Sequence, residues 1–311
     1  MKILFWGTPA FAVPSLLALS DEGHDIVGVV TQPDRPAGRG RRLRSSAVKE
    51  TALEESIPVL EPESPRGEDF IEQITALGAD LSVVVAYGQI LQRAVLVVPP
   101  MGSINLHASL LPALRGAAPI NWAIVRGDAV TGVTVMRMAE RMDAGPILLQ
   151  TEELILEGET VAELTTRLSE IGAEALLEVL ALLAAGAIEE REQEESAATY
   201  APKVDRATAR IDWAASGVEV AGLIRGMDAV PGAWSELDGN PVKLFRPQPA
   251  TENELAGLPG TILEVSRDAG LMVSTGQGAV WITEVQPAGK SRMRAGDWVL
   301  GRAVTVGQRF E

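Results

Sequence analysis

The sequence contains no cysteine and only two histidines, His24 and His107. Without cysteine the chain has no disulfide, no thiolate nucleophile and no cysteine metal site. Two histidines are too few for a histidine-rich zinc site, so we predict no metal. No apolar run reaches the roughly 18 residues that a membrane helix needs, so we predict no membrane partner. The start, MKILFWGTPAFAVP, reads as a first β-strand rather than a signal peptide, which favours a cytoplasmic protein.

Charge is distributed unevenly along the 311 residues. Acidic residues outnumber basic ones by 42 to 27, for a net charge of −15. Residues 151–196 hold thirteen Glu against two Arg, whereas the stretch RPAGRGRRLR (35–44) holds five Arg and no acid. A local cationic surface can therefore coexist with an acidic chain, and the total charge does not exclude a nucleic-acid partner.

The first half of the chain alternates strand-like and helix-like segments. The strand-like segments are β-branched and apolar on both faces, which suits a buried, mostly parallel sheet; they are KILFW (2–6), DIVGVV (25–30), LSVVVA (81–86), SINL (103–106) and GVTVMR (132–137). Apolar residues at helical spacing lie between and after them, and Thr160 with Glu163 forms a predicted capping box. We predict an α/β domain over 1–188, with a Rossmann-like, doubly wound sheet.

The pattern changes near residue 189. The stretch EEREQEES is polar and has no periodicity, so we predict a linker over 189–206. The later segments are short, and Asp238-Gly239-Asn240 and Ala269-Gly270 separate strand-like runs, which indicates hairpins. We predict a small, OB-like β-barrel over 207–311.

Three polar residues form a candidate catalytic group: Asn105, His107 and Asp143. Asn105 and His107 are two apart at the end of a predicted strand, so both side chains point to one side. Asp143 follows the next strand, where a turn could return it to the same crevice. An amide and an imidazole could donate to a developing oxyanion, and the carboxylate could accept or relay a proton, as acyl transfer to an amine requires. The same residues also have a structural interpretation, because Asn and Asp are common at turns.

Nine motifs follow one another along the chain: FWGTPAFAVPSL (5–16), TQPDRPAGRGRRL (31–43), VVVAYGQIL (83–91), INLHASLLP (104–112), RGAAPI (115–120), MDAGPI (142–147), TYAPK (199–203), VPGA (230–233) and GKSRM (289–293). With them, the chain resembles the 10-formyltetrahydrofolate-dependent formyltransferases over essentially its whole length. The resemblance implies that Asn105, His107 and Asp143 are catalytic. It also implies transfer of a formyl group from 10-formyltetrahydrofolate to the amine of methionine on initiator methionyl-tRNA, by a monomer that uses no metal.

The resemblance also assigns binding residues. It implies that the pterin of the folate lies against the backbone of Gln89, Ile90 and Leu91, after the third predicted strand. It also implies that Ser109, Leu110, Leu111 and Pro112 bind and shape the folate site. It implies that cations of an inserted loop and of the domain junction contact tRNA, namely Arg35, Arg39, Arg41, Arg42, Arg44 and Lys203. Arginine pairs with phosphate through two hydrogen bonds, which suits that loop. Lys290, Arg292, Arg294 and Arg302 could extend the RNA surface.

Alternative functions remain open at the level of sequence. A nucleotide-sugar formyltransferase would share the catalytic residues but would have no use for the five-Arg loop. A purine-pathway formyltransferase would lack the barrel, and a non-catalytic RNA-binding protein could use the same scaffold. The chain departs from the family pattern at Leu114, Gln92 and Ser45–Ala47, none of which belongs to the catalytic group.

Overall fold

The computed structural model describes residues 1–37, 42–250, 257–302 and 304–311. The chain forms two compact units, each assembled from three chain segments. Unit 1 comprises Met1–Gly116, Thr131–Glu153 and Thr165–Tyr200. Unit 2 comprises Ala117–Val130, Leu154–Leu164 and Ala201–Glu311. The predicted linker 189–206 is thus shared between the units, and the linear bounds 1–188 and 207–311 stay a prediction.

Unit 1 is built on a seven-stranded sheet in the order β10-β9-β7-β6-β1-β2-β5. Its strands are β1 (Lys2–Gly7), β2 (Asp25–Val30), β5 (Val59–Leu60), β6 (Leu81–Val85), β7 (Ser103–His107), β9 (Val130–Arg137) and β10 (Ile147–Leu154). The five strands from β7 to β5 are parallel, and β9 is antiparallel to β7. From β1 the chain adds β2 and β5 on one side of β1, and it then adds β6 and β7 on the other side. This change of direction is the switch point at which open α/β sheets bind ligands.

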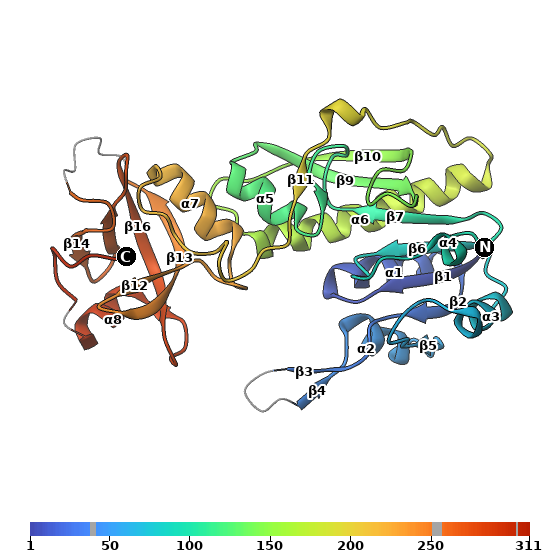
Figure 1. Cartoon of the computed structure of the whole chain (residues 1–311), viewed down its shortest axis with the longest axis horizontal. Helices are drawn as coiled ribbons and strands as arrows, with labels where there is room; N and C mark the ends of the chain where they lie inside the picture. Colours follow the sequence, from blue (N-terminus) through green and yellow to red (C-terminus); the bar gives the residue numbers. More distant parts are fainter. Residues whose placement is uncertain (38–41, 251–256, 303) are drawn as a thin grey trace. The chain divides into compact units, whose positions relative to one another are not determined.

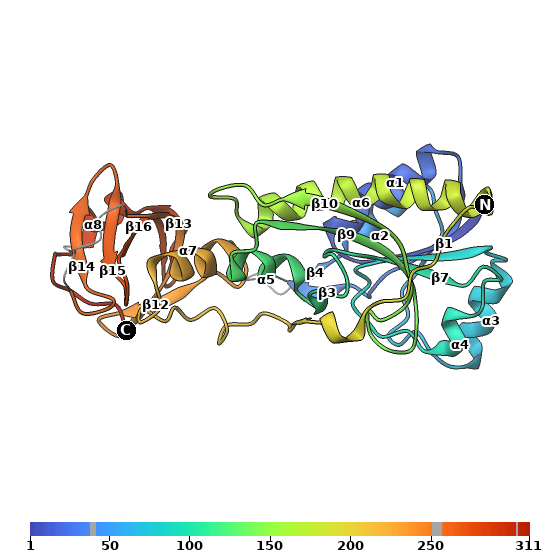
Figure 2. The ribbon, with the colours of Figure 1, turned by 90° about the horizontal axis from the view of Figure 1, so that it is seen from above.

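Helices cover both faces of this sheet, with α1 and α6 on one face and α3 and α4 on the other (Figure 2). The helices and short elements of this part are η1 (Ala10–Ala12), α1 (Val13–Asp21), α2 (Ala47–Glu54), α3 (Glu68–Ala76), α4 (Arg93–Leu96), α6 (Val161–Ala184), η2 (Glu195–Ala197), and the strand pair β8 (Arg115–Gly116) with β11 (Tyr200–Ala201). On the α3 face, Trp6 stacks edge-on against Phe70 and Tyr87. On the other face, Gly172 lets α6 approach the side chain of Leu106 closely. The predicted doubly wound domain is confirmed.

The helix α6 begins with the predicted capping box. The backbone N–H of Thr160 donates to the Glu163 carboxylate at 2.8 Å, and the Glu163 N–H donates to Thr160 Oγ1 at 3.4 Å. The Thr160 hydroxyl and backbone hold the pKa of Glu163 down to about 2. None of the helices in the described ranges is both long and apolar enough to span a membrane.

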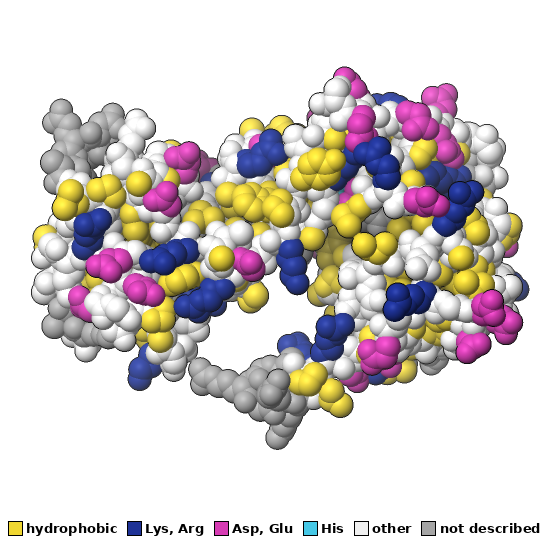
Figure 3. All heavy atoms as spheres, viewed as in Figure 1, with side chains coloured by type: hydrophobic (Ala, Val, Ile, Leu, Met, Phe, Trp, Pro, Cys, Tyr) yellow, Lys and Arg dark blue, Asp and Glu magenta, His cyan; other side chains and the backbone are white. Residues whose placement is uncertain are grey.

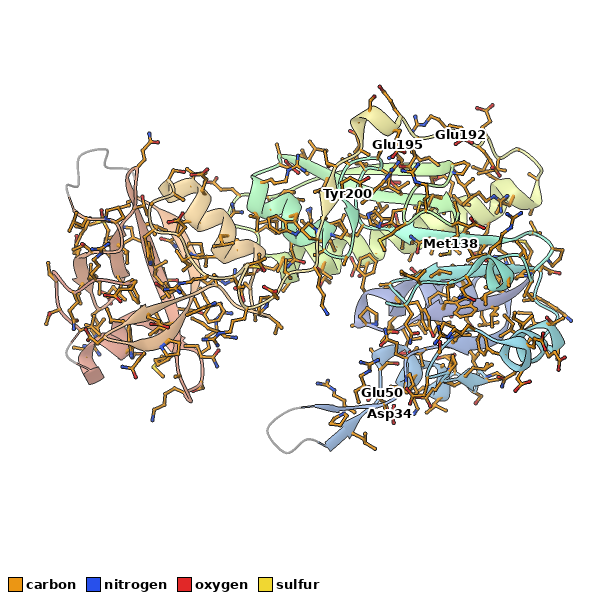
Figure 4. The ribbon with its side chains drawn as sticks, viewed as in Figure 1. Asp34, Glu50, Met138, Glu192, Glu195 and Tyr200 are labelled. Carbon is orange, nitrogen blue, oxygen red and sulfur yellow. The ribbon has the colours of Figure 1, made fainter. Side chains whose placement is uncertain are left out.

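A two-stranded hairpin, β3 (Arg35–Ala37) with β4 (Arg42–Arg44), projects from unit 1 ahead of α2 (Figure 1). Asp34 and Glu50 lie near its base (Figure 4). There Lys49 pairs with Asp34 at 2.9 Å and with Glu61 at 2.8 Å, which lowers the pKa of Asp34. Ser46 caps α2 by accepting from the Lys49 N–H at 3.1 Å. The Ser45–Ala47 departure therefore still supplies a helix start.

The C-terminal part of unit 2 is an antiparallel sheet in the order β12-β13-β16-β15-β14, with β17 beside β16. Its elements are β12 (Trp234–Leu237), β13 (Asn240–Pro249), β14 (Ile262–Ser266), β15 (Gly270–Ser274), β16 (Ala279–Pro287), β17 (Met293–Arg294) and the helices α7 (Gly217–Gly226) and α8 (Ala295–Arg302). The last residues close the sheet, because Phe310 bridges to Leu237 and Arg309 bridges to Thr261. The predicted small barrel and its hairpins at Asp238-Gly239 and before Gly270 are confirmed.

Unit 2 also contains α5 (Pro119–Arg126), which lies between β8 and β9 in the sequence. This helix packs on α7, and the Asn121 side chain donates to the carbonyl of Gly226 at 2.7 Å. A Cβ at Gly226 would lie 2.9 Å from the Asn121 carbonyl oxygen and 2.6 Å from a methyl of Val125. Glycine is needed there because the two helices approach so closely.

Candidate active site

Asn105 and His107 lie on β7, between two paired strands. Asn105 is opposite Val84 of β6 and Met136 of β9, and His107 is opposite Thr134 of β9. Successive side chains of a strand alternate between faces, so Asn105 and His107 share one face, as predicted. The side-chain amide of Asn105 makes no hydrogen bond within the part of the chain that the structure describes, and is available to a ligand.

Asp143 reaches His107 through a loop that folds back over the sheet. The strand β9 is antiparallel to β7, so its end at Arg137 lies beside Ile104, at the start of β7. The loop then returns, and the Arg137 N–H donates to the carbonyl of Pro146 at 2.9 Å. This fold brings Asp143 Oδ2 to 3.8 Å from His107 Nδ1, with side chains only 15% and 7% exposed. The three predicted catalytic side chains are thus brought to one region of unit 1.

The two nitrogens of the His107 ring have different partners. Nε2 lies 3.0 Å from the carbonyl oxygen of Leu114. A carbonyl can only accept, so Nε2 carries a proton and donates it. Nδ1 faces the Asp143 carboxylate at 3.8 Å, which is longer than a direct hydrogen bond. Catalytic hydrogen bonds are often loose before substrate binds and tighten in the reacting complex.

Asp143 is held in place by hydrogen bonds to its side chain and to its backbone. Its Oδ2 accepts the N–H of Gly116 at 2.8 Å. Its φ of +51° lies in the left-handed region, which a non-glycine residue adopts only when its surroundings fix it. The side-chain amide of Gln193 supplies that support, because it donates to the carbonyls of Asp143 at 2.9 Å and of Gly145 at 2.8 Å.

Gln193 belongs to a polar network that the sequence analysis does not identify. The Arg115 side chain, 2% exposed, donates to Gln193 Oε1 at 2.8 and 3.1 Å and to Glu195 at 3.1 Å. Arg141, on the Asp143 loop, also donates to Glu195 at 2.5 Å. The only sequence signal was that Arg115 opens the RGAAPI motif. Gln193 is one glutamine within an acidic stretch, where neither periodicity nor spacing marks it.

The residues predicted for the pterin lie in the loop after β6. Leu91 is buried, Ile90 is exposed and Gln89 is half-buried. The loop is anchored at Tyr87, whose carbonyl accepts from Thr8 and Gln32, both at 2.9 Å. Within the described residues, no backbone group of Gln89–Leu91 is hydrogen-bonded. Since β6 is parallel to β7, this loop leaves the sheet at the same edge as His107.

The second group of predicted folate residues, Ser109–Pro112, contains a cis peptide bond at Leu111-Pro112. Ser109 is buried, and its hydroxyl donates to the carbonyl of Ala113 at 2.6 Å. Leu110 and Leu111 line a cavity of about 500 Å³ with residues of β10, Glu189 and Arg191. The catalytic residues and Gln89–Leu91 do not line this cavity. The structure therefore brings together the catalytic group, and it places Leu110 and Leu111 on the β10 side of β7.

The predicted cationic residues lie in both units. Arg35 and Arg44 are exposed and directly opposite each other in the β3–β4 hairpin. Arg42 lies on β4, while Arg39 and Arg41 fall outside the described residues. Lys203 is exposed and follows β11, in unit 2.

Arg292, in the GKSRM motif, is half-buried and pairs with two acidic side chains. It pairs with Asp228 at 2.7 Å and Glu284 at 2.5 Å, and its guanidinium lies 4.1 Å from the centre of the Phe245 ring. Basic and acidic side chains are mixed on the visible face of the barrel (Figure 3). Within the 289–302 region, Arg292 is therefore neutralised by two acidic side chains.

Comparison with known proteins agrees with this fold. Residues 1–180 match the family described as formyl transferase, and residues 203–303 match the formyl transferase C-terminal domain. The chain belongs to the formyl transferase family. Within it, the chain is similar to methionyl-tRNA formyltransferases. It is 46% identical over 310 residues to the protein of Symbiobacterium thermophilum, covering 100% of this chain and 95% of that protein. For Alkaliphilus oremlandii the identity is 44% over 307 residues, with coverage of 99% and 98%.

Solved structures share the fold at lower identity. HypX from Aquifex aeolicus, in complex with tetrahydrofolic acid, superposes with a TM-score of 0.67 at 22% identity, over 96% of this chain and 47% of that chain. WlaRD, a sugar 3N-formyl transferase, superposes with a TM-score of 0.68 at 17% identity, over 94% of this chain and 99% of that chain. The same architecture thus spans both parts of this chain.

Proposed function

We propose that this chain transfers the formyl group of 10-formyltetrahydrofolate to the amino group of methionine on initiator methionyl-tRNA, through Asn105, His107 and Asp143. The observation that carries the proposal is the convergence of these side chains at one edge of the sheet, with Asp143 Oδ2 3.8 Å from His107 Nδ1. Family membership and relatives 44–46% identical over nearly the whole chain support the substrates. We also propose that the chain acts as a monomer in the cytoplasm.

The folate co-substrate supplies the formyl carbonyl and the nitrogen that leaves. The backbone groups of Gln89–Leu91, which have no hydrogen-bond partner among the described residues, fit this assignment. They could hydrogen-bond the edge of a flat heterocycle at the sheet's ligand-binding edge. Ser109–Pro112 shape a separate part of the folate-binding region under this proposal.

The catalytic side chains have distinct tasks. The Asn105 amide donates to the carbonyl oxygen as negative charge develops, and losing such a donor costs about 3–4 kcal/mol of transition-state stabilisation. His107 is fixed by Leu114 through Nε2 and directs Nδ1 toward the Asp143 carboxylate, which lies beside it. Asp143 accepts the proton that the attacking amine must lose and relays it to the departing folate nitrogen as the bond from that nitrogen to the formyl carbon breaks, which contributes roughly 10²–10⁴-fold. The amine is itself the nucleophile, so no covalent enzyme intermediate is needed.

We propose that tRNA is bound by two groups of cations. The hairpin segment supplies Arg35, Arg39, Arg41, Arg42 and Arg44, and the segment after β11 supplies Lys203. The exposure of Arg35 and Arg44 supports this, because facing residues of a ladder present their side chains on the same side.

The double substitution of Arg35 and Arg44 by Gln tests the hairpin. We expect the KM for tRNA to rise with little change in the KM for 10-formyltetrahydrofolate. The slope of log K against log salt should become shallower by about 1.4–1.8, for two lost phosphate contacts. Titration of tRNA binding at several salt concentrations measures this. The matched control replaces Arg66 and Arg93 by Gln, which removes two exposed charges elsewhere in unit 1. Equal losses in both double variants would contradict a specific role for the hairpin.

The decisive assay for the function combines the protein with methionine-charged initiator tRNA and 10-formyltetrahydrofolate. We expect N-formylmethionyl-tRNA and tetrahydrofolate in equal amounts. Release of tetrahydrofolate without formylated tRNA would indicate a hydrolase, and formylation of an amino sugar nucleotide in place of tRNA would indicate the alternative acceptor.

A further inference from the structure

The Gln193 side chain directs its hydrogen bonds mainly to the loop that carries Asp143 and to Arg115, with a longer contact of 3.9 Å to the sulfur of Met136. Its two N–H groups go to the carbonyls of Asp143 and Gly145, and its oxygen accepts twice from the Arg115 guanidinium. The reverse amide orientation would set oxygen against two carbonyl oxygens and N–H against guanidinium N–H. Only one orientation of the side chain satisfies these partners, so Gln193 has a single well-defined position.

The contacts form a closed ring around Asp143. Arg115 holds Gln193, Gln193 holds the Asp143 carbonyl, and Gly116, next to Arg115 in the chain, donates its N–H to the Asp143 carboxylate. The backbone of Asp143 is thus held by Gln193, and its side chain is held by Gly116, which is joined to the same network through Arg115. These contacts hold Asp143 in a left-handed conformation, which is uncommon for residues other than glycine although Asp tolerates it better than most.

The network is anchored on both sides. Arg115 is buried, and its charge is compensated by Glu195 at 3.1 Å. Glu195 also accepts from Arg141, two residues before Asp143, at 2.5 Å. Arg191 and Ile147 exchange backbone hydrogen bonds at 2.7 and 2.9 Å, which fixes the segment against β10. Figure 4 shows Glu192 and Glu195 on this segment of unit 1, after α6.

We propose that Gln193, held by Arg115 and Glu195, is a positioning residue that sets the Asp143 carboxylate toward His107. The expected effect on kcat rests on the proposed function, whereas the placement of the Asp143 carboxylate by Gln193 does not. This placement gives the acidic segment 189–196 a role in the active site. The segment orients the catalytic carboxylate of Asp143, although the two lie far apart in the sequence.

The test is Gln193→Met, which keeps a side chain of similar length but removes its hydrogen bonds. We expect kcat for formyl transfer to fall about 10–10²-fold, since a small misplacement of a reacting group can cost that much. The KM values for tRNA and 10-formyltetrahydrofolate should stay within about twofold, because the substitution changes the orientation of a catalytic group and leaves the binding contacts in place. The control is Glu192→Met, an exposed neighbour on the same segment, which should leave kcat unchanged.

A second readout is independent of activity. The Gly116 amide proton donates to the Asp143 carboxylate, so its NMR resonance reports whether the carboxylate is in place. We expect this resonance to move upfield in Gln193→Met and to stay unchanged in Glu192→Met, whether or not the wild-type chain formylates tRNA. If Gln193→Met does not fold, Gln193→Glu gives the same two readouts, since it keeps an acceptor for Arg115 but loses both donors.

An unchanged Gly116 resonance in the folded variant would overturn the proposal, even if kcat falls. A shifted resonance with wild-type kcat would overturn the kinetic part of it. If instead the wild-type chain forms no product, the proposed function fails, while the resonance still decides whether Gln193 positions Asp143.

Discussion

Replacing Asp143 with alanine is expected to lower kcat for formyl transfer about 10²–10⁴-fold, because the substitution removes the proton acceptor beside His107. The Gly116 N–H also loses its acceptor. Binding of tRNA should be nearly unchanged, since the proposed RNA contacts lie elsewhere in the chain. Single-turnover formylation and tRNA titration measure the two effects separately.

Two further variants sharpen this prediction. Asp143→Asn keeps an oxygen for the Gly116 N–H but cannot take up a proton, so we expect a similar loss of turnover. Glu140→Ala removes an exposed carboxylate from the same loop and should keep wild-type kcat. Normal turnover in Asp143→Asn would mean that the carboxylate only orients its neighbours, and normal turnover in Asp143→Ala would refute the mechanism.

Replacing Gly145 with alanine is expected to disturb both stability and turnover. An added Cβ would lie 1.9 Å from the carbonyl oxygen of Arg137, and no side-chain rotation can relieve a clash with backbone. The loop must shift, and Gly145 then loses its contact with Gln193. We expect the free energy of unfolding to fall by about 1–3 kcal/mol, as overpacked sites show. We expect kcat to fall about 10²-fold, because the Asp143 turn moves with it.

Denaturant unfolding and steady-state kinetics measure the Gly145→Ala effects. The control is Gly301→Ala, where an added Cβ meets no atom within 4 Å. Wild-type stability and turnover in Gly145→Ala would show that the loop accommodates the methyl group, and that the tight turn is not required to place Asp143.

The sequence predicted those parts of the site that depend on local pattern. Strand periodicity placed Asn105 and His107 on one face at the end of β7, and the capping-box residues Thr160 and Glu163 marked the start of α6. Asp143 was predicted to follow the next strand, where a turn could return it to the crevice, but no local signal gives the path of its loop. Nine residues separate β9 from β10, and whether such a loop folds back over the sheet depends on tertiary contacts that no spacing specifies.

The network around Gln193 could not be predicted for a related reason. Its partners Arg115 and Asp143 are 78 and 50 positions away in the sequence, so only the fold brings them together. The polar stretch EEREQEES resembled a solvated linker because composition does not distinguish a free segment from one that packs along a sheet edge. Likewise, Arg292 is predicted as a surface cation, and only the structure shows that Asp228 and Glu284 neutralise its charge.

The pairing of α5 with α7 limits how this protein can be recombined. A hybrid that joins its N-terminal portion, through β11, to the barrel of a relative would keep α5 but receive a foreign α7. The native contact needs glycine at 222 and 226 so that α7 can lie against the α5 backbone. A bulkier residue at either place would push the helices apart and expose apolar surface. Chimaeras should therefore stay functional when α5 and the C-terminal segment that contains α7 are taken from the same parent protein.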